Sequence, residues 1–360
     1  MVVKGRLMKT LILAAGRFDD ELKAQIADDR EPRLDVFELA TRLGADFVDF
    51  RAADQSRVLE VRALRRAFGP SAAVAYLGWQ MSDQYDALFT TGEDIGIPLA
   101  AFMRPRRSRC SHTMIAHTLS PGKKGVFFRW LDVGRRIDRI LCYSTSEERY
   151  IVERLHVPAE KVERIYFHAD DHFFKPIGSA PEPDLICAAG QLLRDYDTLV
   201  EAVRDLPVRV QIAAGSPWIE RPLEPTKTLP PNVSWGRLSR FDLRALYRRS
   251  ALAVVPIFQN EYQTGIATIL EMMAAGKCVI ATRTRGQTDT IVDGVTGLYV
   301  PPGEPTALRA TIARMLEHPE DAAKIGQNAR RFVEEQASLD RFVDRVAQAI
   351  QVGHGARLAA

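Results

Sequence analysis

The amino-acid sequence predicts an α/β protein made of two domains, each built around a parallel β-sheet. Short apolar runs alternate with amphipathic stretches of helical period along most of the 360 residues, which is the pattern of repeated βαβ units. One stretch interrupts the alternation, because Pro176–Pro183 has the Pro-, Gly- and Ser-rich composition of a linker. A chain of this length suits about two domains, each with its own core.

The elements are predicted in order from these patterns. Before the linker, the predicted strands are Thr10–Ala15, Asp46–Phe50, Ala73–Leu77, Ala87–Thr90, Leu99–Met103, Thr113–His117, Ile140–Ser144 and Val162–Phe167. The predicted helices there are Leu34–Leu43, Gln55–Phe68 and Ser146–Leu155. After the linker, the predicted strands are Asp184–Gly190, Arg209–Gly215, Leu252–Phe258 and Cys278–Thr282. The predicted helices are Tyr196–Leu206, Asp242–Arg248, one that begins near Gly265, Pro305–Glu317, Glu320–Glu335 and Ser338–Val352.

These elements define the expected domains. Residues 1–176 form the first domain, 177–183 the linker and 184–335 the second domain. Residues 336–360 are expected to form a C-terminal helix that crosses back to the first domain. Two α/β domains joined at a hinge leave a cleft between their sheets, which is the default place for a ligand.

Composition excludes several classes of protein. Apolar residues make up 46% and charged residues 26% of the chain, as in ordinary globular domains. The four cysteines are far apart and none belongs to a CxxC pair, so buried free thiols are expected rather than a zinc site. No apolar run approaches the ~20 residues that a membrane span needs, and the apolar stretch near the start is too short for a signal peptide. A cytoplasmic protein is therefore expected.

The segment 252–303 contains the most informative βαβ unit. The loop Gln259–Thr264 follows an apolar strand and precedes the helix near Gly265. Ligands of parallel sheets bind beyond the carboxyl ends of the strands, and helix N-termini attract phosphate. Glu271 lies about two turns along this helix and falls off the predicted buried stripe, which consists of Ile266, Ile269, Leu270 and Met273. The unit therefore predicts a site for a ligand with phosphates and hydroxyl groups.

Residues 101–139 form a strongly basic segment within a chain whose net charge is only +3. The segment has ten Lys and Arg residues but only Asp132 and Asp138 as acids, and residues 126–131 interleave its cations with aromatic and aliphatic side chains. This pattern is typical of an interfacial helix on an anionic membrane. The alternative is a helix whose aromatic residues pack on the domain core while its cations face water. Nucleic acid is disfavoured, because no nucleic-acid motif accompanies the charges.

Four segments together resemble a known family. These are ILEMMAAGKCVIAT, GQTDTIVDGVTGLYVPPGEPTAL, CAAGQLLRDYDTLVEAV and, before the linker, CYSTSEERYIVERLHVPAEKVERIYFHADDHFFKP. Their order and spacing resemble the retaining glycosyltransferases of family four, also called glycosyl transferases group 1, over most of residues 85–335. The resemblance implies the GT-B fold, with two Rossmann-like domains. It also implies hexose transfer from a nucleotide diphosphate sugar to a hydroxyl acceptor with retained anomeric configuration. The nucleotide sugar is a co-substrate, and no metal or other cofactor is implied.

The resemblance assigns donor-binding positions one by one. Glu271 matches the second of two family glutamates and is expected to bind the ribose. Gln263 stands where the first glutamate is usual, and Glu261 could take that role through a loop shift. Gln191 replaces the usual diphosphate-binding arginine, and Arg194 resembles the following lysine. The other expected donor-binding residues are Gly16, Gly190, Gly215, Ser216, Thr264 and Gly265.

The acceptor side is predicted from the first domain. His117 resembles the strand-end histidine of the family that lies near the sugar and the acceptor, although a structural role is an open alternative. Membrane-associated members glycosylate lipids, so a diacylglycerol or lipid-linked saccharide is the expected acceptor, on the inner face of the membrane. The expected membrane or acceptor contacts are Lys123, Lys124, Phe127, Phe128, Arg129 and Trp130.

Two other classes of function remain open from the sequence. One is a nucleotide-sugar epimerase or hydrolase on the same fold, and the other is a non-catalytic sugar-nucleotide-binding partner. The glutamine residues at positions 191 and 263 favour the second alternative, because each replaces a charged family residue. Asp170 and Asp171 could suggest a metal, but a solvated turn beside the linker is the favoured interpretation.

Overall fold

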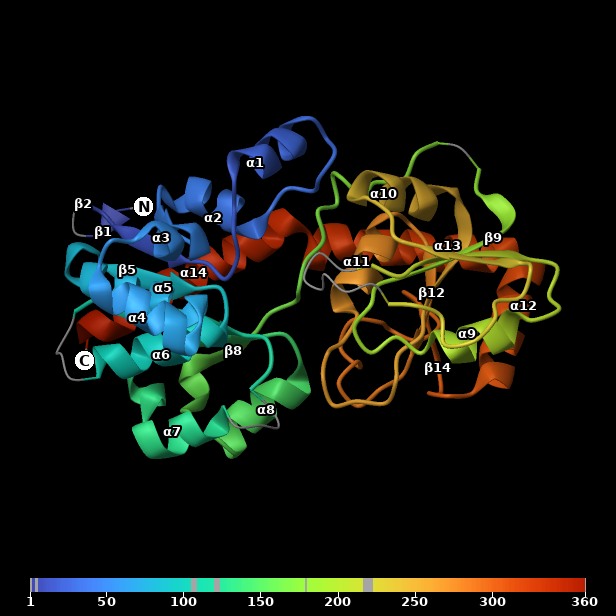
Figure 1. Ribbon diagram of the computed structural model, residues 1–360. Helices are drawn as coiled ribbons and strands as arrows, with labels where there is room; N and C mark the ends of the chain where they lie inside the picture. The colour runs from blue at the N-terminus through green and yellow to red at the C-terminus, as the bar shows by residue number, and fades with distance from the viewer. Residues whose placement is uncertain are drawn as a thin grey trace. The chain divides into compact units, whose positions relative to one another are not determined.

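The computed structural model describes residues 2–3, 6–104, 109–119, 124–178, 180–215 and 223–359, without the side chains of residues 2, 3, 6, 7 and 129–131. The chain divides into two compact units. The first unit comprises Met1–Ala24, Leu34–Ile165 and Asp340–Ala360, and the second comprises Gln25–Arg33 and Tyr166–Leu339. Each unit contains a six-stranded parallel sheet with helices on both faces (Figure 1).

The first unit has the strand order β4-β3-β5-β6-β7-β8. Its strands are β3 (Thr10–Leu13), β4 (Asp46–Val48), β5 (Ala87–Thr90), β6 (Ser111–Ala116), β7 (Arg139–Cys142) and β8 (Val162–Arg164), preceded by the short antiparallel pair β1 (Val2–Val3) and β2 (Arg6–Leu7). Its α-helices are α2 (Asp35–Leu43), α3 (Phe50–Gln55), α4 (Leu59–Phe68), α5 (Pro70–Met81), α6 (Glu93–Met103), α7 (Gly125–Leu131), α8 (Thr145–Glu153) and α14 (Leu339–Ala359). Single turns of 3-10 helix are η1 (Ser82–Gln84), η2 (Val133–Arg136) and η3 (Ala159–Lys161). Helix α1 (Asp20–Ala27) begins in this unit and ends in the other.

The second unit has the strand order β11-β10-β9-β12-β13-β14. Its strands are β9 (Glu182–Ala189), β10 (Arg209–Ala213), β11 (Val233–Gly236), β12 (Ser250–Val255), β13 (Cys278–Thr282) and β14 (Leu298–Val300). Its helices are α9 (Tyr196–Val203), α10 (Arg240–Arg249), α11 (Ile266–Ala274), α12 (Pro305–Glu317) and α13 (Pro319–Phe332), with the π-helical segment η4 (Val333–Ala337) after α13. In each sheet the strands are parallel, so their carboxyl ends lie along the same edge of that sheet. Parallel sheets bind ligands at this edge.

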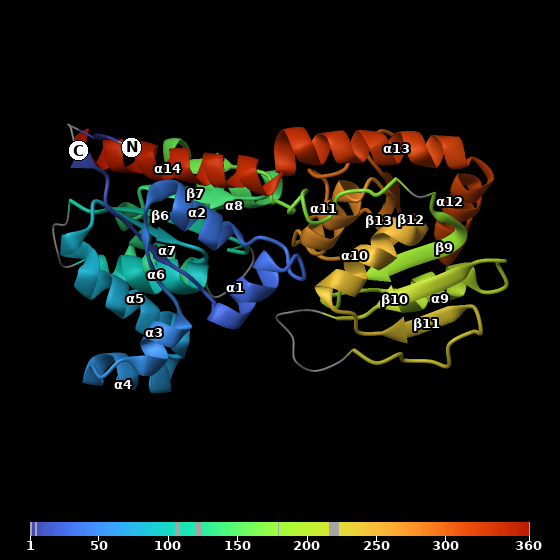
Figure 2. The ribbon, with the colours of Figure 1, turned by 90° about the horizontal axis from the view of Figure 1, so that it is seen from above.

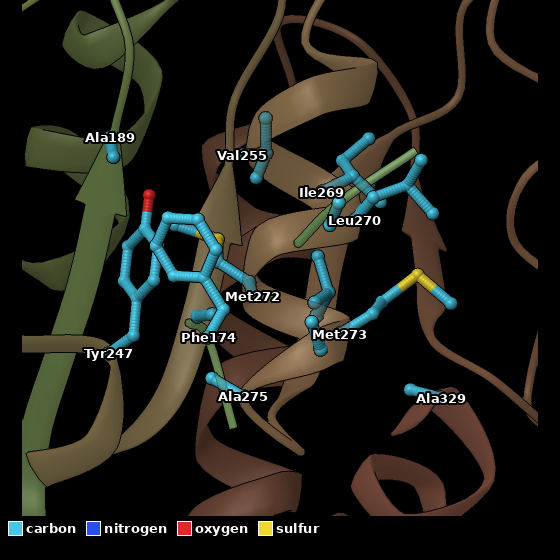
Figure 3. Packing of buried hydrophobic residues seen from close by; sticks show 14 of the residues in the cluster. Phe174, Ala189, Tyr247, Val255, Ile269, Leu270, Met272, Met273, Ala275 and Ala329 are labelled. Atoms are coloured by element: carbon cyan, nitrogen blue, oxygen red, sulfur yellow. The ribbon is translucent and has the colours of Figure 1, made fainter. Parts of the chain in front are cut away.

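Apolar packing on both faces explains why the strands have continuous apolar runs rather than alternating ones. In the second unit, one core cluster lies between the sheet and helices α10 and α11, and another lies under α9 and α12. Phe174 and Tyr247 lie beside each other next to α11, with ring centroids 5.9 Å apart (Figure 3). In the first unit, α14 runs along β6 and β7 (Figure 2), and Gly353 lies so close to Arg139 that a Cβ would approach its side chain to 2.9 Å.

Two strand predictions are wrong. Ala73–Leu77 and Leu99–Met103 lie inside helices α5 and α6. Both helices are apolar because they are largely buried, and a short apolar run does not distinguish a buried strand from a buried helix. The strand β11 was not predicted, because only its first residue, Val233, is buried. The strand Cys278–Thr282 and the helix Pro305–Glu317 are confirmed with their bounds, and all four cysteines are free and buried, as predicted.

Candidate functional site

Arg194 lies at the carboxyl end of β9 and is buried, with 7% of its surface exposed. Its guanidinium donates from Nε to the Ala189 carbonyl (2.9 Å), from Nη1 to the Leu192 carbonyl (2.8 Å) and from Nη2 to Thr268 Oγ1 (3.2 Å). These bonds join the end of a central strand to the first turn of α11. Burial lowers the pKa of Arg194, while nearby groups that include Glu271 oppose the shift.

Two glycines make the room that Arg194 occupies. Gly190 and Gly265 have φ of +97° and +84°, a conformation that favours glycine. A Cβ on Gly190 would lie 2.3 Å from Arg194 Nη2, and one on Gly265 would lie 3.2 Å from Nη1. The structure therefore brings three predicted donor-binding residues together at the start of α11.

Glu271 is buried, contrary to the expectation from the sequence. The sequence placed it off the buried stripe, but it is only 6% exposed, because α11 is packed around most of its circumference. Its Oε1 atom forms an ion pair with Arg240 Nη1 at 2.9 Å, and its Oε2 atom accepts a hydrogen bond from the Tyr247 hydroxyl at 3.4 Å. A carboxylate offers about four lone-pair sites, so Glu271 retains acceptor capacity for ligand hydroxyl groups.

Arg240 is a site residue that the sequence analysis missed. It is the first residue of α10, after the N-cap Ser239, whose hydroxyl accepts from Asp242 N. A cation at a helix N-terminus interacts unfavourably with the helix dipole. The position of Arg240 near the start of a predicted helix was therefore a signal that a carboxylate lies close to it. Glu271 is that carboxylate, and it raises the pKa of Arg240.

The loop before α11 is organised by Asn260. Asn260 Oδ1 accepts from Tyr262 N at 2.8 Å and from Thr264 Oγ1 at 3.2 Å. This arrangement buries Thr264 and leaves Glu261 at the surface, where it pairs with Arg285 at 3.0 Å.

The next loop, 284–290, packs directly on the loop before α11. A Cβ on Gly286 would lie 2.2 Å from the Tyr262 carbonyl oxygen. Gln263 Nε2 reaches Thr290 Oγ1 at 3.4 Å. Both side chains therefore contact the loop after β13, Gln263 from a partly buried position and Glu261 from the surface.

The remaining predicted donor residues lie at neighbouring strand ends. Gln191 follows Gly190 and is partly buried. Gly215 lies two residues beyond β10, where a Cβ would meet the Arg237 side chain at ordinary van der Waals distances of 3.7 Å and more. Ser216 lies outside the described residues.

In the first unit, His117 and Gly16 lie close to Thr91. The Thr91 hydroxyl accepts from Ala15 N at 3.0 Å, and the Thr91 carbonyl lies 2.8 Å from His117 Nε2. A carbonyl can only accept, so Nε2 carries a proton and Nδ1 is the ring atom that can take up another. A Cβ on Gly16 would lie 2.8 Å from the Phe18 ring, so a side chain there would displace the ring.

Glu93 fixes the turn that follows His117. This buried carboxylate accepts from His117 N (2.9 Å), Thr118 N (3.2 Å) and Lys124 Nζ (2.7 Å). The sequence analysis missed Glu93, although an acidic residue at the start of a helix after a strand is a usual sign of a turn-organising carboxylate.

The predicted membrane-contact segment is divided between surface and core. On α7, Val126 and Phe127 are exposed, at 51% and 43%, whereas Phe128 is 5% exposed and packs in the core. Lys124 pairs with Glu93 and Asp94. Lys123 lies outside the described residues, as do the side chains of Arg129 and Trp130. No helix in the described part of the chain is long and apolar enough to cross a membrane.

Asp170 and Asp171 do not form a solvated turn, so that interpretation is wrong. They are 5% and 7% exposed. The Asp170 carboxylate accepts from the backbone and the guanidinium of Arg33 at 2.8 Å and 3.0 Å. Among the residues that the structure describes, no group of three or more His, Cys, Asp or Glu side chains could hold a metal.

Comparison with known proteins identifies the second unit. Residues 170–332, which include β9 to α13, match the family described as "Glycosyl transferases group 1". The match covers less than half of the chain and lies within the second unit. The resemblance stated from the sequence is therefore confirmed where it was strongest, and it covers Arg194, Gly265 and Glu271.

Two curated relatives match parts of this chain. It is 36% identical over 95 residues to the D-rhamnosyltransferase WbpZ of Pseudomonas aeruginosa, a match that covers 26% of this chain and 25% of that protein. It is 24% identical over 204 residues to the uncharacterized glycosyltransferase MJ1178 of Methanocaldococcus jannaschii, 54% of each. The matches span about a quarter and about half of the lengths of these relatives.

Similar solved structures cover nearly the whole chain. Anabaena Alr3699/HepE in complex with UDP and glucose has a TM-score of 0.68 and 15% identity, over 96% of this chain and 99% of that one. The sucrose-phosphate synthase tll1590 of Thermosynechococcus elongatus has a TM-score of 0.67 and 16% identity, over 95% and 98%. At such identities the likeness lies in the fold. The predicted GT-B class with two Rossmann-like units is confirmed.

Proposed function

We propose that this protein is a retaining glycosyltransferase that moves a hexose from a nucleotide diphosphate sugar to a hydroxyl acceptor. The observation that carries the proposal is the joint placement of Arg194, Gly265 and Glu271 around α11, within the region that matches the glycosyl transferases group 1 family. A cation and a helix N-terminus suit the diphosphate, and a carboxylate farther along the helix suits the ribose. The second unit would thus be the nucleotide-sugar-binding domain.

The donor chemistry follows from the hydrogen-bond capacity of Arg194. A guanidinium has five N–H donors, and three of them are used on Ala189, Leu192 and Thr268. The two that remain can bind phosphate oxygens. A fixed cation is most effective where negative charge grows in the transition state, and the leaving diphosphate is where charge grows in this reaction. In a same-face mechanism that leaving phosphate also helps to deprotonate the acceptor.

The donor sugar is expected to meet Gln263 rather than Glu261. Gln263 is partly buried, whereas Glu261 is exposed and its carboxylate is paired with Arg285. An amide can bind a sugar hydroxyl, but it supplies no negative charge next to a developing oxocarbenium ion. Two similar proteins support a nucleotide-sugar donor, because one was solved with UDP and glucose and another is named a D-rhamnosyltransferase.

The first unit would bind the acceptor, with His117 on the acceptor side and Nδ1 as its proton-accepting atom. For the acceptor we favour a membrane lipid, bound by peripheral association with an anionic inner leaflet. The exposed pair Val126 and Phe127 on α7, together with the basic segment around it, supports this choice. Lys124 contributes less charge to such a surface than the sequence suggested, because it is paired with Glu93.

A donor and lipid panel tests the function. The purified protein is incubated with UDP-, GDP- and ADP-sugars, with and without liposomes that contain diacylglycerol or anionic lipid, and nucleotide diphosphate release is followed. Release that needs one donor and the lipid is the expected result. Release without lipid would indicate a soluble acceptor or a nucleotide-sugar hydrolase.

Two further outcomes separate the remaining alternatives. Donor binding without release would indicate a non-catalytic sugar-nucleotide-binding partner. Conversion of the sugar without release would indicate an epimerase. In the case of binding alone, the variant Gln263→Glu tests whether the missing carboxylate is the cause, because it restores the usual family residue.

A further inference from the structure

The segment Gln25–Arg33 belongs in space to the second unit, although the sequence around it belongs to the first. Arg244 donates from Nη1 to the Asp29 carboxylate (2.8 Å) and from Nη2 to the Asp29 carbonyl (3.1 Å). Arg33 donates from its backbone and its guanidinium to Asp170. The side chains of Arg244 and Asp170 are buried, so loss of either partner would leave an uncompensated buried charge. The segment is therefore firmly held.

Aromatic rings complete the attachment. The Arg244 guanidinium lies over the Phe173 ring at 4.1 Å, and the Arg240 guanidinium lies 5.9 Å from the centroid of Phe174. The two phenylalanines are themselves in edge-to-face contact at 4.9 Å. Arg240 and Arg244, one turn apart on α10, thus rest on the same aromatic pair. The cation that binds the segment and the cation that binds Glu271 are neighbours.

Glu31 lies between the two anchors in sequence and is half-buried. Burial raises its pKa; Arg240 opposes this shift, and the negative charge of Glu271 adds to it. Among these charged groups, Arg240 contacts Glu271. The ion pair with Glu271, at 2.9 Å, is the direct contact.

The chemistry of Glu271 explains what this arrangement can do. A buried carboxylate without a counter-ion tends to take up a proton, and it then loses acceptor capacity for ligand hydroxyl groups. Arg240 is the counter-ion of Glu271 and holds Oε1, while the Tyr247 hydroxyl approaches Oε2. The lone pairs that remain point in a fixed direction. Such a carboxylate is suited to bind the vicinal hydroxyl groups of a ribose.

We propose that Arg240 is a positioning residue for the donor ribose, and that the segment Gln25–Arg33 supports it by holding Arg244, one turn along α10, on the same aromatic pair. The proposal rests on the proposed function, because it takes Glu271 as the ribose ligand. Arg240 acts through Glu271 and is not itself a catalytic residue.

The test couples a protein change to a ligand change. Binding of UDP, GDP and ADP to the full chain is measured by calorimetry, and the tightest binder is then compared with its 2′-deoxy form. Wild type is expected to bind the 2′-deoxy nucleotide about tenfold more weakly than the normal nucleotide. Arg240→Gln is expected to bind the normal nucleotide about tenfold more weakly than wild type does. Its affinity should then fall by less than twofold when the 2′-hydroxyl is removed, because the effects of coupled groups are not additive. Asp29→Asn, which removes the carboxylate that holds Arg244, is expected to show the same coupling at about threefold.

Controls separate this coupling from general damage. Arg249→Gln removes another arginine of α10, one that pairs with Glu182 at the surface, and it is expected to behave as wild type with both ligands. Equal deoxygenation losses in wild type and Arg240→Gln would overturn the proposal while leaving the function intact. Failure of wild type to bind any of the three nucleotides would overturn the proposed function as well. If Arg240→Gln does not fold, Arg240→Lys and Asp29→Asn are judged by the same criterion.

Discussion

At the scale of single residues, Gly190 and Gly294 share a left-handed backbone but differ in their surroundings. Their φ angles are +97° and +76°, yet a Cβ on Gly190 would collide with Arg194, whereas nothing lies within 4 Å of one on Gly294. Gly294→Ala is expected to cost about 1 kcal/mol from backbone strain. Gly190→Ala is expected to cost about 2–4 kcal/mol, because displacement of the guanidinium adds to the strain. Thermal unfolding of both variants checks this, and equal losses would contradict the role given to Gly190.

Arg194 combines a structural and a proposed chemical role, which a charge-conserving change can separate. Lysine keeps the charge but cannot reproduce the planar fork that reaches Ala189, Leu192 and Thr268. Arg194→Lys is expected to lower kcat/KM for the donor about 10- to 100-fold. The control is Arg204→Lys, at an exposed pair with Glu201, which should leave kcat/KM unchanged. Steady-state kinetics decide, and wild-type kinetics in Arg194→Lys would exclude it from the diphosphate site.

At the scale of elements, the central strand pair β5–β6 contains a pH-sensitive histidine. His112 is fully buried, with Nε2 at 3.0 Å from Thr90 Oγ1, and burial lowers its pKa to about 3. In the unfolded chain its pKa is about 6.5. A depressed pKa in the folded state gives a contribution to stability that is complete above the unfolded pKa of about 6.5 and is lost as the pH falls toward 3.

The variant His112→Gln should remove this contribution. Between pH 7 and pH 5, wild type is expected to lose about 2 kcal/mol of unfolding free energy more than His112→Gln does. Urea unfolding at the two pH values measures the difference. His318→Gln, at an exposed histidine, is the control and should retain the wild-type slope. An unchanged slope in His112→Gln would show that other groups cause the pH dependence.

At the scale of the whole molecule, the last helix of the chain belongs to the first unit. Arg357 on α14 pairs with Asp138 at 3.0 Å, next to β7, and the ring centroids of Phe342 and Tyr143 lie 6.4 Å apart. Residues about 200 positions apart in the sequence therefore share one core. The first unit can be complete only when the last residues of the chain have been added.

This arrangement predicts which strands are destabilised by a substitution in α14. Ile350 is fully buried, and Ile350→Ala is expected to cost about 2–5 kcal/mol. Val352, two residues on, is exposed, and Val352→Ala should cost less than about 0.5 kcal/mol. Hydrogen exchange should show the loss of protection in β6 and β7, whereas β9 and β12 of the second unit keep theirs. Equal loss in both units would mean that they unfold together.

Sequence patterns alone were enough to predict the α/β class, most strands of both sheets and the region that the family match confirms. These features depend on local periodicity, on turn residues and on motif spacing, all of which are short-range. The sequence did not distinguish the buried helices α5 and α6 from strands, because complete burial removes the periodicity that separates the two.

The surroundings of the site residues could not be predicted without the folded structure. The fold buried Glu271 against Arg240, placed Arg194 between two glycines, put Phe128 in the core and attached Gln25–Arg33 to the second unit. Each of these depends on contacts between residues that are distant in the sequence. Burial and pairing of charges arise from such contacts, so periodicity and spacing along the chain cannot specify them.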